Sequence, residues 1–457
     1  EYASGKNGNN PYALVNSGGT KDEWYNKVGG RAAINITPIE GLKISGVIAP
    51  NYTYTKNKDF RKAVPYSLED DPNTIGGYME GYNTTKLSEK RNDSYDVTIQ
   101  GIANYMKTFG KHDLNVMAGY ETYRYFGENL GASRDQYELS NFPYLDIGPL
   151  DLRDNSGSAV QLAYQSWFGR VAYNYDNRYL LQANVRYDGS SRFHSDYRWG
   201  VFPSVSAAWV ISQEDFFEPL LNVVNFFKIK GSWGMMGNDN ITAYQYLSMY
   251  SFNSSASYAF GTDPSYVQGV YETRTANPLV TWEKAKTWNV GFSAQFLSGK
   301  LGLDFDYFQS RRNDILITRN ASVPTYSGLS LPAENLGKVK NHGFEVVATY
   351  RDKAGDFEWG ATGNLTYANN EVVYMDEATK TPEWQRATGH PIDGITVYKA
   401  IGIYQTQEEI DATPHLPGTK PGDLIYQDTN GDKSITWDDA IRIDKSTTPK
   451  WIFGLTL

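Results

Sequence analysis

Six oxygen-bearing side chains recur at close spacing near the end of the sequence. They occupy positions 1, 3, 5, 7, 9 and 12 of one loop: Asp428, Asn430, Asp432, Ser434, Thr436 and Asp439. Hard oxygen ligands spaced in this way can wrap one cation, and calcium prefers them. Two departures weaken the match: Lys433 replaces the usual turn glycine, and an aspartate replaces the longer closing glutamate. The loop therefore predicts either a calcium ion that stiffens an outer loop or an Asx-rich turn held by its own side chains.

A second candidate site is a segment in which aromatic rings alternate with Ser and Asn. Its rings lie within residues 241–271, and the candidates for contact with a substrate or partner are Tyr244, Tyr246, Tyr250, Phe252, Tyr258 and Phe260. Flat rings beside adaptable hydrogen-bonding groups suit sugar stacking or peptide docking. The alternative is a long loop that folds on its own hydrophobic side chains or packs against a partner.

Charged side chains also surround an Asp-Gly step in the segment YDGSSRF. The cluster comprises Arg186, Asp188, Gly189 and Arg192. Asp-Gly favours a sharp turn, and a brief connection between two strands needs a fixed register. We therefore expect a structural turn cluster, with substrate contact as the alternative.

Enzyme chemistry is not indicated by the sequence. GxSxG, HExxH and phosphate-loop motifs are absent, and the five His are scattered without metal-ligand spacing. Paired carboxylates such as Asp70 with Asp71 are adjacent in sequence, which rarely gives the separation that acid/base catalysis needs. We expect no catalytic residues and no required cofactor. The net charge of −9 also disfavours nucleic acid as a partner, and the absence of Cys excludes disulfides and thiolate metal sites.

The elements that position these residues are predicted to be strands. Apolar residues alternate with polar ones in segments such as 179–187, 288–296, 301–307 and 357–367. Similar runs cover 31–37, 42–54, 93–106, 113–126, 166–176, 200–212, 226–234 and 342–351. We expect roughly a dozen to fourteen strands, many of about 9–11 residues, which is the length that crosses a bilayer when tilted. No apolar run approaches the 18 residues of a membrane helix.

The connections between these strands fall into two classes. Short ones lie at 38–41, 108–112, 175–178, 297–300 and 352–356, and long ones at 55–92, 128–164, 235–282, 319–339 and 371–450. The two classes largely alternate, apart from a brief loop at 190–198 and a medium connection at 214–225. Up-and-down transmembrane barrels sort their loops in this way, with short periplasmic turns and long outer loops. A β-sandwich or propeller has no reason to do so. Tyr and Trp near strand ends fit interfacial rings, although Tyr is also simply a good strand residue.

Five blocks resemble the SusC-like (SusC/RagA) TonB-dependent outer-membrane importers of Bacteroidetes. They are YDGSSRFHSDYRWGVFPSVSAAW, KIKGSWGMMGNDNI, NPLVTWEKAKTWNVGFSAQF, ENLGKVKNHGFEVVATY and PGDLIYQDTNGDKSITWDD, in family order. The resemblance implies an all-β fold: a transmembrane antiparallel up-and-down β-barrel, part of a 22-stranded one. Residues 1–457 would form one incomplete barrel domain, covering the middle and late barrel. We expect the plug, the TonB-contact segment and the closing strands to be absent from it.

The resemblance also implies a function. Members of the family span the bacterial outer membrane and actively import a large nutrient, an oligosaccharide or an oligopeptide. A SusD-like surface lipoprotein assists them, and energy reaches the plug through the TonB complex. Two alternatives remain open at this point: a passive porin or adhesin barrel, and a secreted β-rich glycan-binding module. The sequence does not name the substrate.

Overall fold

The computed structural model describes residues 10–68, 71–260, 265–318, 332–378 and 380–457. Its main element is an antiparallel sheet, which has fourteen strands among the described residues. The strand order is β1-β3-β6-β7-β8-β9-β10-β11-β14-β15-β16-β17-β22, and β2 pairs with β3 beside β1. These strands are β1 (Gly19–Gly29), β2 (Ala32–Ile39), β3 (Leu42–Arg61), β6 (Lys86–Phe109), β7 (His112–Arg134), β8 (Arg153–Tyr175), β9 (Tyr179–Ser190), β10 (Trp199–Val210), β11 (Val224–Asn238), β14 (Glu283–Phe296), β15 (Leu301–Thr318), β16 (Ala333–Ala354), β17 (Phe357–Tyr374) and β22 (Trp451–Thr456).

The remaining elements are short and belong to the connections. The small strands are β4 (Pro65–Ser67), β5 (Ile75–Tyr78), β12 (Met249–Phe260), β13 (Ser265–Arg274), β18 (Gly394–Val397), β19 (Ala400–Ile403), β20 (Leu424–Tyr426) and β21 (Ile441–Ser446). The helices are α1 (Pro11–Ser17) and α2 (Gln407–Ala412), with 3-10 turns η1 (Leu145–Ile147), η2 (Ile211–Gln213), η3 (Asp215–Leu220), η5 (Glu383–Gln385) and η6 (Trp437–Asp439). Within the described ranges, neither α-helix nor any other helical segment has the length and hydropathy to cross a membrane.

The chain divides into two compact units. The first comprises Glu1–Pro38, Lys43–Ala103 and Gly119–Gln165, and the second comprises Ile39–Leu42, Asn104–Ala118 and Ser166–Leu457. In the first unit, α1 begins after Asn10, whose side-chain oxygen accepts hydrogen bonds from the backbone N–H groups of Tyr12 and Ala13. A small buried cluster formed by Phe60, Leu87 and Tyr137 ties the ends of its strands together.

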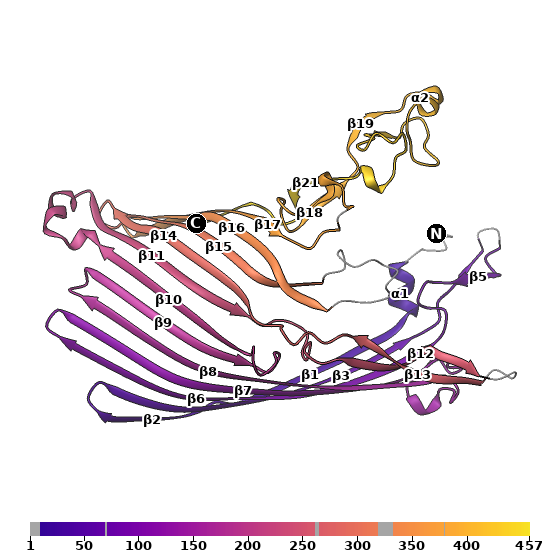
Figure 1. The fold of residues 1–457 in the computed structure, drawn as a ribbon, viewed down its shortest axis with the longest axis horizontal. Helices are drawn as coiled ribbons and strands as arrows, with labels where there is room; N and C mark the ends of the chain where they lie inside the picture. The colour runs from indigo at the N-terminus through magenta and orange to yellow at the C-terminus, as the bar shows by residue number, and fades with distance from the viewer. Residues whose placement is uncertain (1–9, 69–70, 261–264, 319–331, 379) are drawn as a thin grey trace. The chain divides into compact units, whose positions relative to one another are not determined.

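All the short turns belong to the second unit and lie at one end of its strands (Figure 1). They connect β2 to β3, β6 to β7, β8 to β9, β14 to β15, and β16 to β17. Asp176 and Asn177 both adopt a positive φ of 54°, which short polar side chains tolerate and which a tight primed hairpin turn requires. The medium connection between β10 and β11, with η2 and η3, lies at the same end (Figure 1). The predicted sorting of the turns is confirmed.

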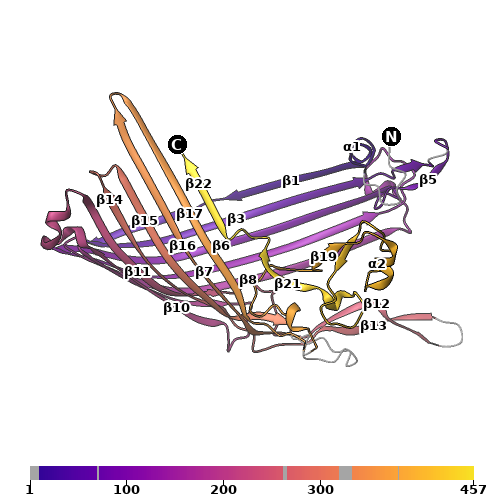
Figure 2. The same ribbon diagram turned by 90° about the horizontal axis from the view of Figure 1, so that it is seen from above.

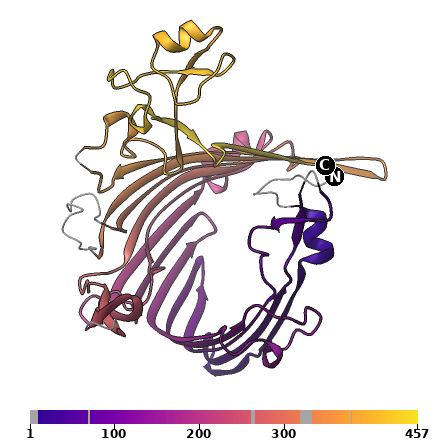
Figure 3. The same cartoon turned by 90° about the vertical axis from the view of Figure 1, so that its right-hand side faces the viewer.

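The long connections of the second unit lie at the opposite ends of its strands. One carries the β12–β13 hairpin and another carries a lobe with α2 and the pairs β18–β21 and β19–β20. In Figure 1 the outer part of this lobe, with α2 and β19, stands away from β16 and β17, and Figure 3 shows the lobe in yellow above the orange strands. The brief connection at 191–198 joins β9 to β10 on the long-loop side. Its length is unusual for that side, but its position is the one that the up-and-down order requires. In the first unit, long connections link β3 to β6 and β7 to β8.

The strand prediction needs three corrections. Most main strands are longer than predicted, such as β6 with 24 residues and β16 with 22, because pairing continues where both faces of the sheet are wet and alternation no longer marks a strand. Strand β1 was not predicted, since its segment TKDEWYNKV carries charges without a clean alternation. The Asp188–Gly189 step lies inside β9, where these residues pair with Gly200 and Trp199, so the sharp turn predicted there was wrong. The chain reverses at 191–198.

Candidate functional site

The register of the second unit gives its sheet one polar face. Three consecutive rows across β9, β10, β11 and β14 contain mainly small or polar residues on this face. They are Gln182–Ser206–Ser232–Asn289, Leu180–Ala208–Lys230–Gly291 and Asn184–Ser204–Gly234–Thr287. Since paired residues point to the same side of an antiparallel sheet, the polar character extends over neighbouring strands. Asp304 and Asp306 continue this face on β15.

The opposite face carries the apolar residues. Rings follow one another across β11, β14, β15 and β16, with centroid separations of 6.0 Å, 5.7 Å and 6.3 Å. The row is continued on β17 and β22, and its members are Phe227, Phe292, Phe305, Phe344, Tyr367 and Trp451. An apolar face opposite a polar one on the same strands is the arrangement of a barrel wall between lipid and a wet interior.

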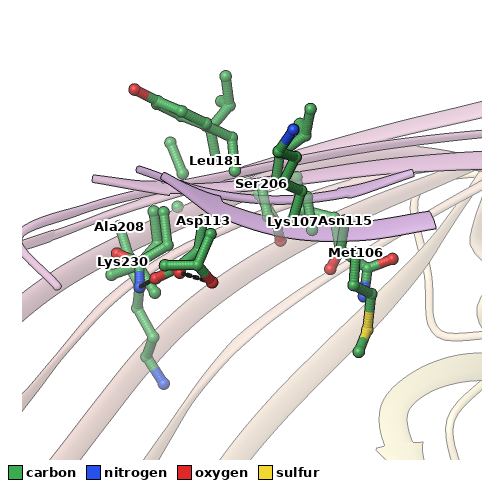
Figure 4. Close-up of a pocket in the computed structure, with 18 of the residues that line it drawn as sticks. Met106, Lys107, Asp113, Asn115, Leu181, Ser206, Ala208 and Lys230 are labelled. Carbon is green, nitrogen blue, oxygen red and sulfur yellow. Dashed lines mark hydrogen bonds between the residues drawn. The ribbon is translucent and has the colours of Figure 1, made fainter. Parts of the chain in front are cut away.

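A pocket of about 550 Å³ lies on the polar face near the short turns (Figure 4). Its walls come from β6 to β11 and from β14. Lys230 is at one side, where its ammonium group donates to Asp306 at 2.6 Å. At the other side the hydroxyl of Thr108 donates to Asp113, also at 2.6 Å. The pocket therefore offers fixed charges, hydroxyls and amide groups to a polar occupant.

The predicted turn cluster separates into two parts. Arg186 pairs with Asp188 at 2.9 Å within β9. Arg192, three residues beyond Gly189, instead contacts the long connection that follows β11. It forms an ion pair with Asp239 at 3.5 Å and donates a hydrogen bond to the carbonyl of Ile241. These contacts tie one loop to the next and support the structural interpretation of the cluster.

Gly189 has a packing role rather than a turn role. A Cβ at this position would come within 2.8 Å of the Trp199 ring. That ring stacks on Tyr187 with centroids 4.6 Å apart. The glycine therefore lets a tryptophan lie flat across the neighbouring strand.

A buried cluster at the base of the long loops was missed by sequence reasoning. It comprises Phe193, Phe202, Val280 and Trp282, and Phe193 and Val280 have no exposed surface. The indole N–H of Trp282 donates to the carbonyl of Arg198 at 2.8 Å. The FPSVSAAW and NPLVTW segments are distant in sequence, so alternation within either gave no signal that they meet.

The aromatic candidates are only partly brought together. Tyr246 packs edge-on against His194 with ring centroids 5.9 Å apart and also contacts Tyr244. Tyr250 is 64% exposed. The side chains of Phe252, Tyr258 and Phe260 lie outside the described residues. Tyr246 is thus part of the loop base, whereas Tyr250 is accessible; contact with a substrate stays a prediction for all six.

The oxygen-rich loop is ordered by its own carboxylates. Asp439 is fully buried and accepts hydrogen bonds from the backbone N–H groups of Thr429, Asn430 and Thr436. Burial alone would raise the pKa of Asp439, but these three N–H groups and the Asp428 side chain together lower it. Lys433 takes the left-handed conformation, with φ 64°, that the usual glycine would adopt.

Other side chains of the loop also bind backbone N–H groups. Asp428 accepts from Gly431 and Lys433, and Asp432 accepts from Ser434. Among the described residues, no group of three or more His, Cys, Asp or Glu side chains is placed to hold a metal. Asx turns therefore account for the loop's order, and a calcium ion bound by Asn430, Thr436 and the other oxygens stays a prediction.

The comparisons with known proteins agree with this geometry. The family model described as "TonB dependent receptor-like, beta-barrel" matches residues 2–439. The chain belongs to this family. The TonB-dependent receptor SusC of Bacteroides thetaiotaomicron is 29% identical over 399 residues, which are 84% of this chain and 38% of the relative. The TonB-dependent receptor P3 of Formosa agariphila is 28% identical over 427 residues, 88% of this chain and 41% of the relative.

Solved structures show the same fold. The RagAB peptide transporter gives a TM-score of 0.74 at 23% identity, covering 97% of this chain and 46% of that chain. The RagAB peptide importer in its 'open-open' state gives 0.76, with the same coverage and identity. The chain spans about two fifths of the length of the curated relatives that it matches. The predicted SusC-like membership, the antiparallel transmembrane fold and the outer-membrane location are confirmed.

Proposed function

We propose that this chain forms the wall of an active importer that carries an oligosaccharide across the outer membrane, coupled to TonB. The observation that carries the proposal is the two-faced sheet of the second unit. Its polar face presents amides, hydroxyls and charges over neighbouring strands, and its other face is apolar. A large hydrophilic solute needs such a wet wall inside a lipid-facing one.

The long connections support a carbohydrate as the substrate class. Tyr250 offers an exposed ring, and rings of this kind stack on the apolar faces of sugars. The polar face offers amide and hydroxyl groups such as those of Gln182, Asn289 and Ser232. These neutral groups suit a neutral, hydroxyl-rich solute.

We also propose that a SusD-like surface lipoprotein assists import and that energy enters through TonB. The first is supported by the similarity to SusC and to RagAB, and the second by the family match. A lipoprotein that caps the outer side would meet the connections of 239–282 and 375–450, where β12, β13 and the α2 lobe lie.

Uptake by cells tests this proposal. A strain that lacks the gene is compared with its parent for uptake of labelled oligosaccharides of graded length, with labelled oligopeptides in parallel. We expect the deletion to abolish uptake of one oligosaccharide class, and a protonophore to stop the same uptake in the parent. Uptake that survives the protonophore would indicate a passive pore, and loss of peptide uptake alone would replace the sugar by a peptide.

A narrower experiment tests the role of the aromatic connection. Tyr250→Ala in the complete protein removes an exposed ring without opening a buried cluster. We expect weaker uptake at low oligosaccharide concentration and unchanged uptake at saturation. Phe216→Ala, which removes an exposed ring at the short-turn end, is the matched control and should leave uptake unchanged.

A further inference from the structure

A row of basic side chains crosses the apolar face of the second unit near its long loops. Lys286 on β14 pairs with Arg311 on β15, and Arg311 pairs with Lys340 on β16. These strands are direct neighbours, as Figure 2 shows. Lys286 and Arg311 lie an even number of residues from Trp288 and Tyr307 on the same strands, and Lys340 pairs with Arg311, so all three cations occupy the face of these two rings.

The position of this row along the strands places it at a membrane boundary. The step from Leu301 to Arg311 along β15 covers ten residues, about 34 Å at about 3.4 Å per residue. With a strand tilt of about 40°, this is a rise of roughly 26 Å, close to the apolar band of about 25 Å. Leu301 pairs with Tyr350, which contacts Trp359 with ring centroids 5.2 Å apart, and these aromatic residues mark the short-turn boundary. The basic row therefore lies at the outer boundary.

Two of the three charges of the row, those of Lys286 and Arg311, have no ion-pair partner among the described residues. Lys340 pairs with Glu371 at 2.8 Å. Lys286, Arg311 and the nearby Lys338 are exposed, and no acidic group of the described residues lies within ion-pair distance of them. Like charges that face each other directly across neighbouring strands are destabilising. An anion between them would remove that repulsion.

Two acidic residues on the neighbouring segments have partners of their own. Asp314 pairs with Lys284 at 3.3 Å. Glu377 accepts the hydroxyl of Thr388 at 2.8 Å. The surface around the three unbalanced cations is therefore basic overall.

A hollow of about 460 Å³ adjoins the row. Its lining includes Arg311, Asn313, Lys338, Lys340, Val373 and Gly389. It also includes Glu371, whose carboxylate is paired with Lys340. Gly389 is fixed there because its N–H donates to the carbonyl of Val372 at 2.8 Å. Arginine binds phosphate through two parallel N–H bonds, and lysine binds it as a point charge. The hollow thus combines phosphate ligands with an apolar band directly below.

We propose that this hollow binds the phosphate headgroup of an outer-leaflet lipid, with Arg311 and Lys338 as its ligands and Lys286 adding positive charge from the neighbouring strand. The lipid's acyl chains would lie along the apolar face beneath, beside Trp288 and Tyr307. A soluble anion would use the cations but not this band. The site is separate from import, since its side chains point away from the polar face.

Native mass spectrometry of the detergent-purified protein tests the site. The protein is titrated with diphosphoryl lipid A, with fully dephosphorylated lipid A and with inorganic phosphate. We expect preferential binding of the phosphorylated lipid. The double variant Lys286→Gln/Arg311→Gln should weaken that binding at least about tenfold, or about 1.4 kcal/mol, and leave the dephosphorylated lipid unaffected.

The matched control removes two cations from the opposite face. Lys228→Gln/Arg351→Gln has the same change in net charge, and both residues belong to the polar-face rows. It should bind diphosphoryl lipid A as the unaltered protein does. Circular dichroism and elution volume report whether each variant keeps its strands.

Three results would overturn the proposal. Equal binding of the phosphorylated and dephosphorylated lipids would show that the charges are not used. Binding of inorganic phosphate as tight as that of the lipid would identify a soluble anion as the occupant. A shift of oligomeric mass in the Lys286→Gln/Arg311→Gln variant, without a change in lipid affinity, would mean that a second copy covers the row. None of these results bears on uptake of the nutrient, which is tested separately.

Discussion

The two ends of the strands in the second unit are held by different kinds of contact. At the short-turn end each hairpin is closed by local contacts, such as the N–H of Arg178 to the carbonyl of Tyr175, and longer contacts such as Lys111 to Asp176 join neighbouring turns. At the long-loop end they join residues far apart in sequence, such as the Trp282 indole and the Arg198 carbonyl, 84 residues apart. Local contacts form from a few neighbouring residues, whereas distant ones must overcome the entropy of closing a long loop. The two ends should therefore respond differently to mutation.

Glu214 shows how the short-turn end is fixed. Its carboxylate accepts the Tyr179 hydroxyl at 2.6 Å and the Trp209 indole N–H at 3.0 Å, and it pairs with Arg178 at 3.2 Å. Rings with polar tips suit a membrane interface because the ring lies in lipid and the tip in water. The Glu214 carboxylate thus binds the polar groups of two aromatic side chains at this end of the strands.

The largest effect should follow from removing a ring from the buried cluster of Phe193, Phe202, Val280 and Trp282 at the base of the long loops. Phe193→Ala removes a fully buried ring that lies 5.3 Å from the ring of Trp282. We expect the free energy of unfolding to fall by about 3–5 kcal/mol, measured by urea titration of the protein in lipid vesicles. Phe216→Ala at the short-turn end, where the side chain is exposed, should cost less than about 1 kcal/mol. Equal costs would remove the distinction between the two ends.

The next largest effect should come from Asp439→Ala in the oxygen-rich loop. Three backbone N–H groups in part-buried hydrogen bonds would lose their acceptor, and a hydrogen bond to a charged group contributes about 1.5–3 kcal/mol. We expect amide hydrogen exchange of residues 428–440 to accelerate at least tenfold. Asp438→Ala is the control, because this neighbouring carboxylate is exposed. An unchanged exchange rate in Asp439→Ala would show that the loop is held by something else.

Two glycines allow a smaller comparison. Gly189→Ala, on the long-loop side, places a methyl group against the Trp199 ring and should cost about 1–2 kcal/mol by overpacking. At Gly363, nearer the short turns, an added methyl group meets nothing within 4 Å. Gly363→Ala should therefore be neutral or stabilise the protein by up to about 1 kcal/mol, because alanine lowers the conformational entropy of the unfolded chain. Thermal denaturation of both variants measures the difference. Two effects of the same sign would contradict this contrast.

The smallest expected effect is a pH dependence at the short-turn end. The Tyr179 hydroxyl and Trp209 indole, with Arg178, hold the pKa of Glu214 below its ordinary value of 4.5. A depressed carboxyl pKa contributes stability above pH 4.5, and this contribution is lost as pH falls through the lower folded-state pKa. The melting temperature of the unaltered protein should therefore fall more between pH 5 and pH 3 than that of Glu214→Gln. Parallel pH curves would exclude Glu214 as the group responsible.

The strands and short turns could be predicted because their signals are local. Alternation at Trp288, Val290 and Phe292 indicates the apolar face directly, and the register confirms it. The turn at Asp176 and Asn177 follows from side chains that tolerate a positive φ. The order of short and long connections then predicted the up-and-down topology before any contact was known.

The loop contacts could not be predicted in this way. Nothing in the sequence around Arg192 indicates a contact with Asp239 or Ile241, since the contact depends on where two separate connections meet. Gly189 looked like a turn residue because Asp-Gly usually is one, and the deciding neighbour, Trp199, lies on the next strand. The basic row was likewise invisible, since Lys286, Arg311 and Lys340 are far apart in sequence and only the register brings them together.

The length of the strands has a consequence for how a solute reaches the membrane. β16 has 22 residues, about 75 Å at about 3.4 Å per residue. At a tilt of about 40° it rises roughly 57 Å, more than twice the apolar band of about 25 Å. About half of the strand's height therefore extends beyond the apolar band into water, as part of a stiff hydrogen-bonded wall. In the proposed importer, a solute would meet this extended wall well before it came level with the first lipid.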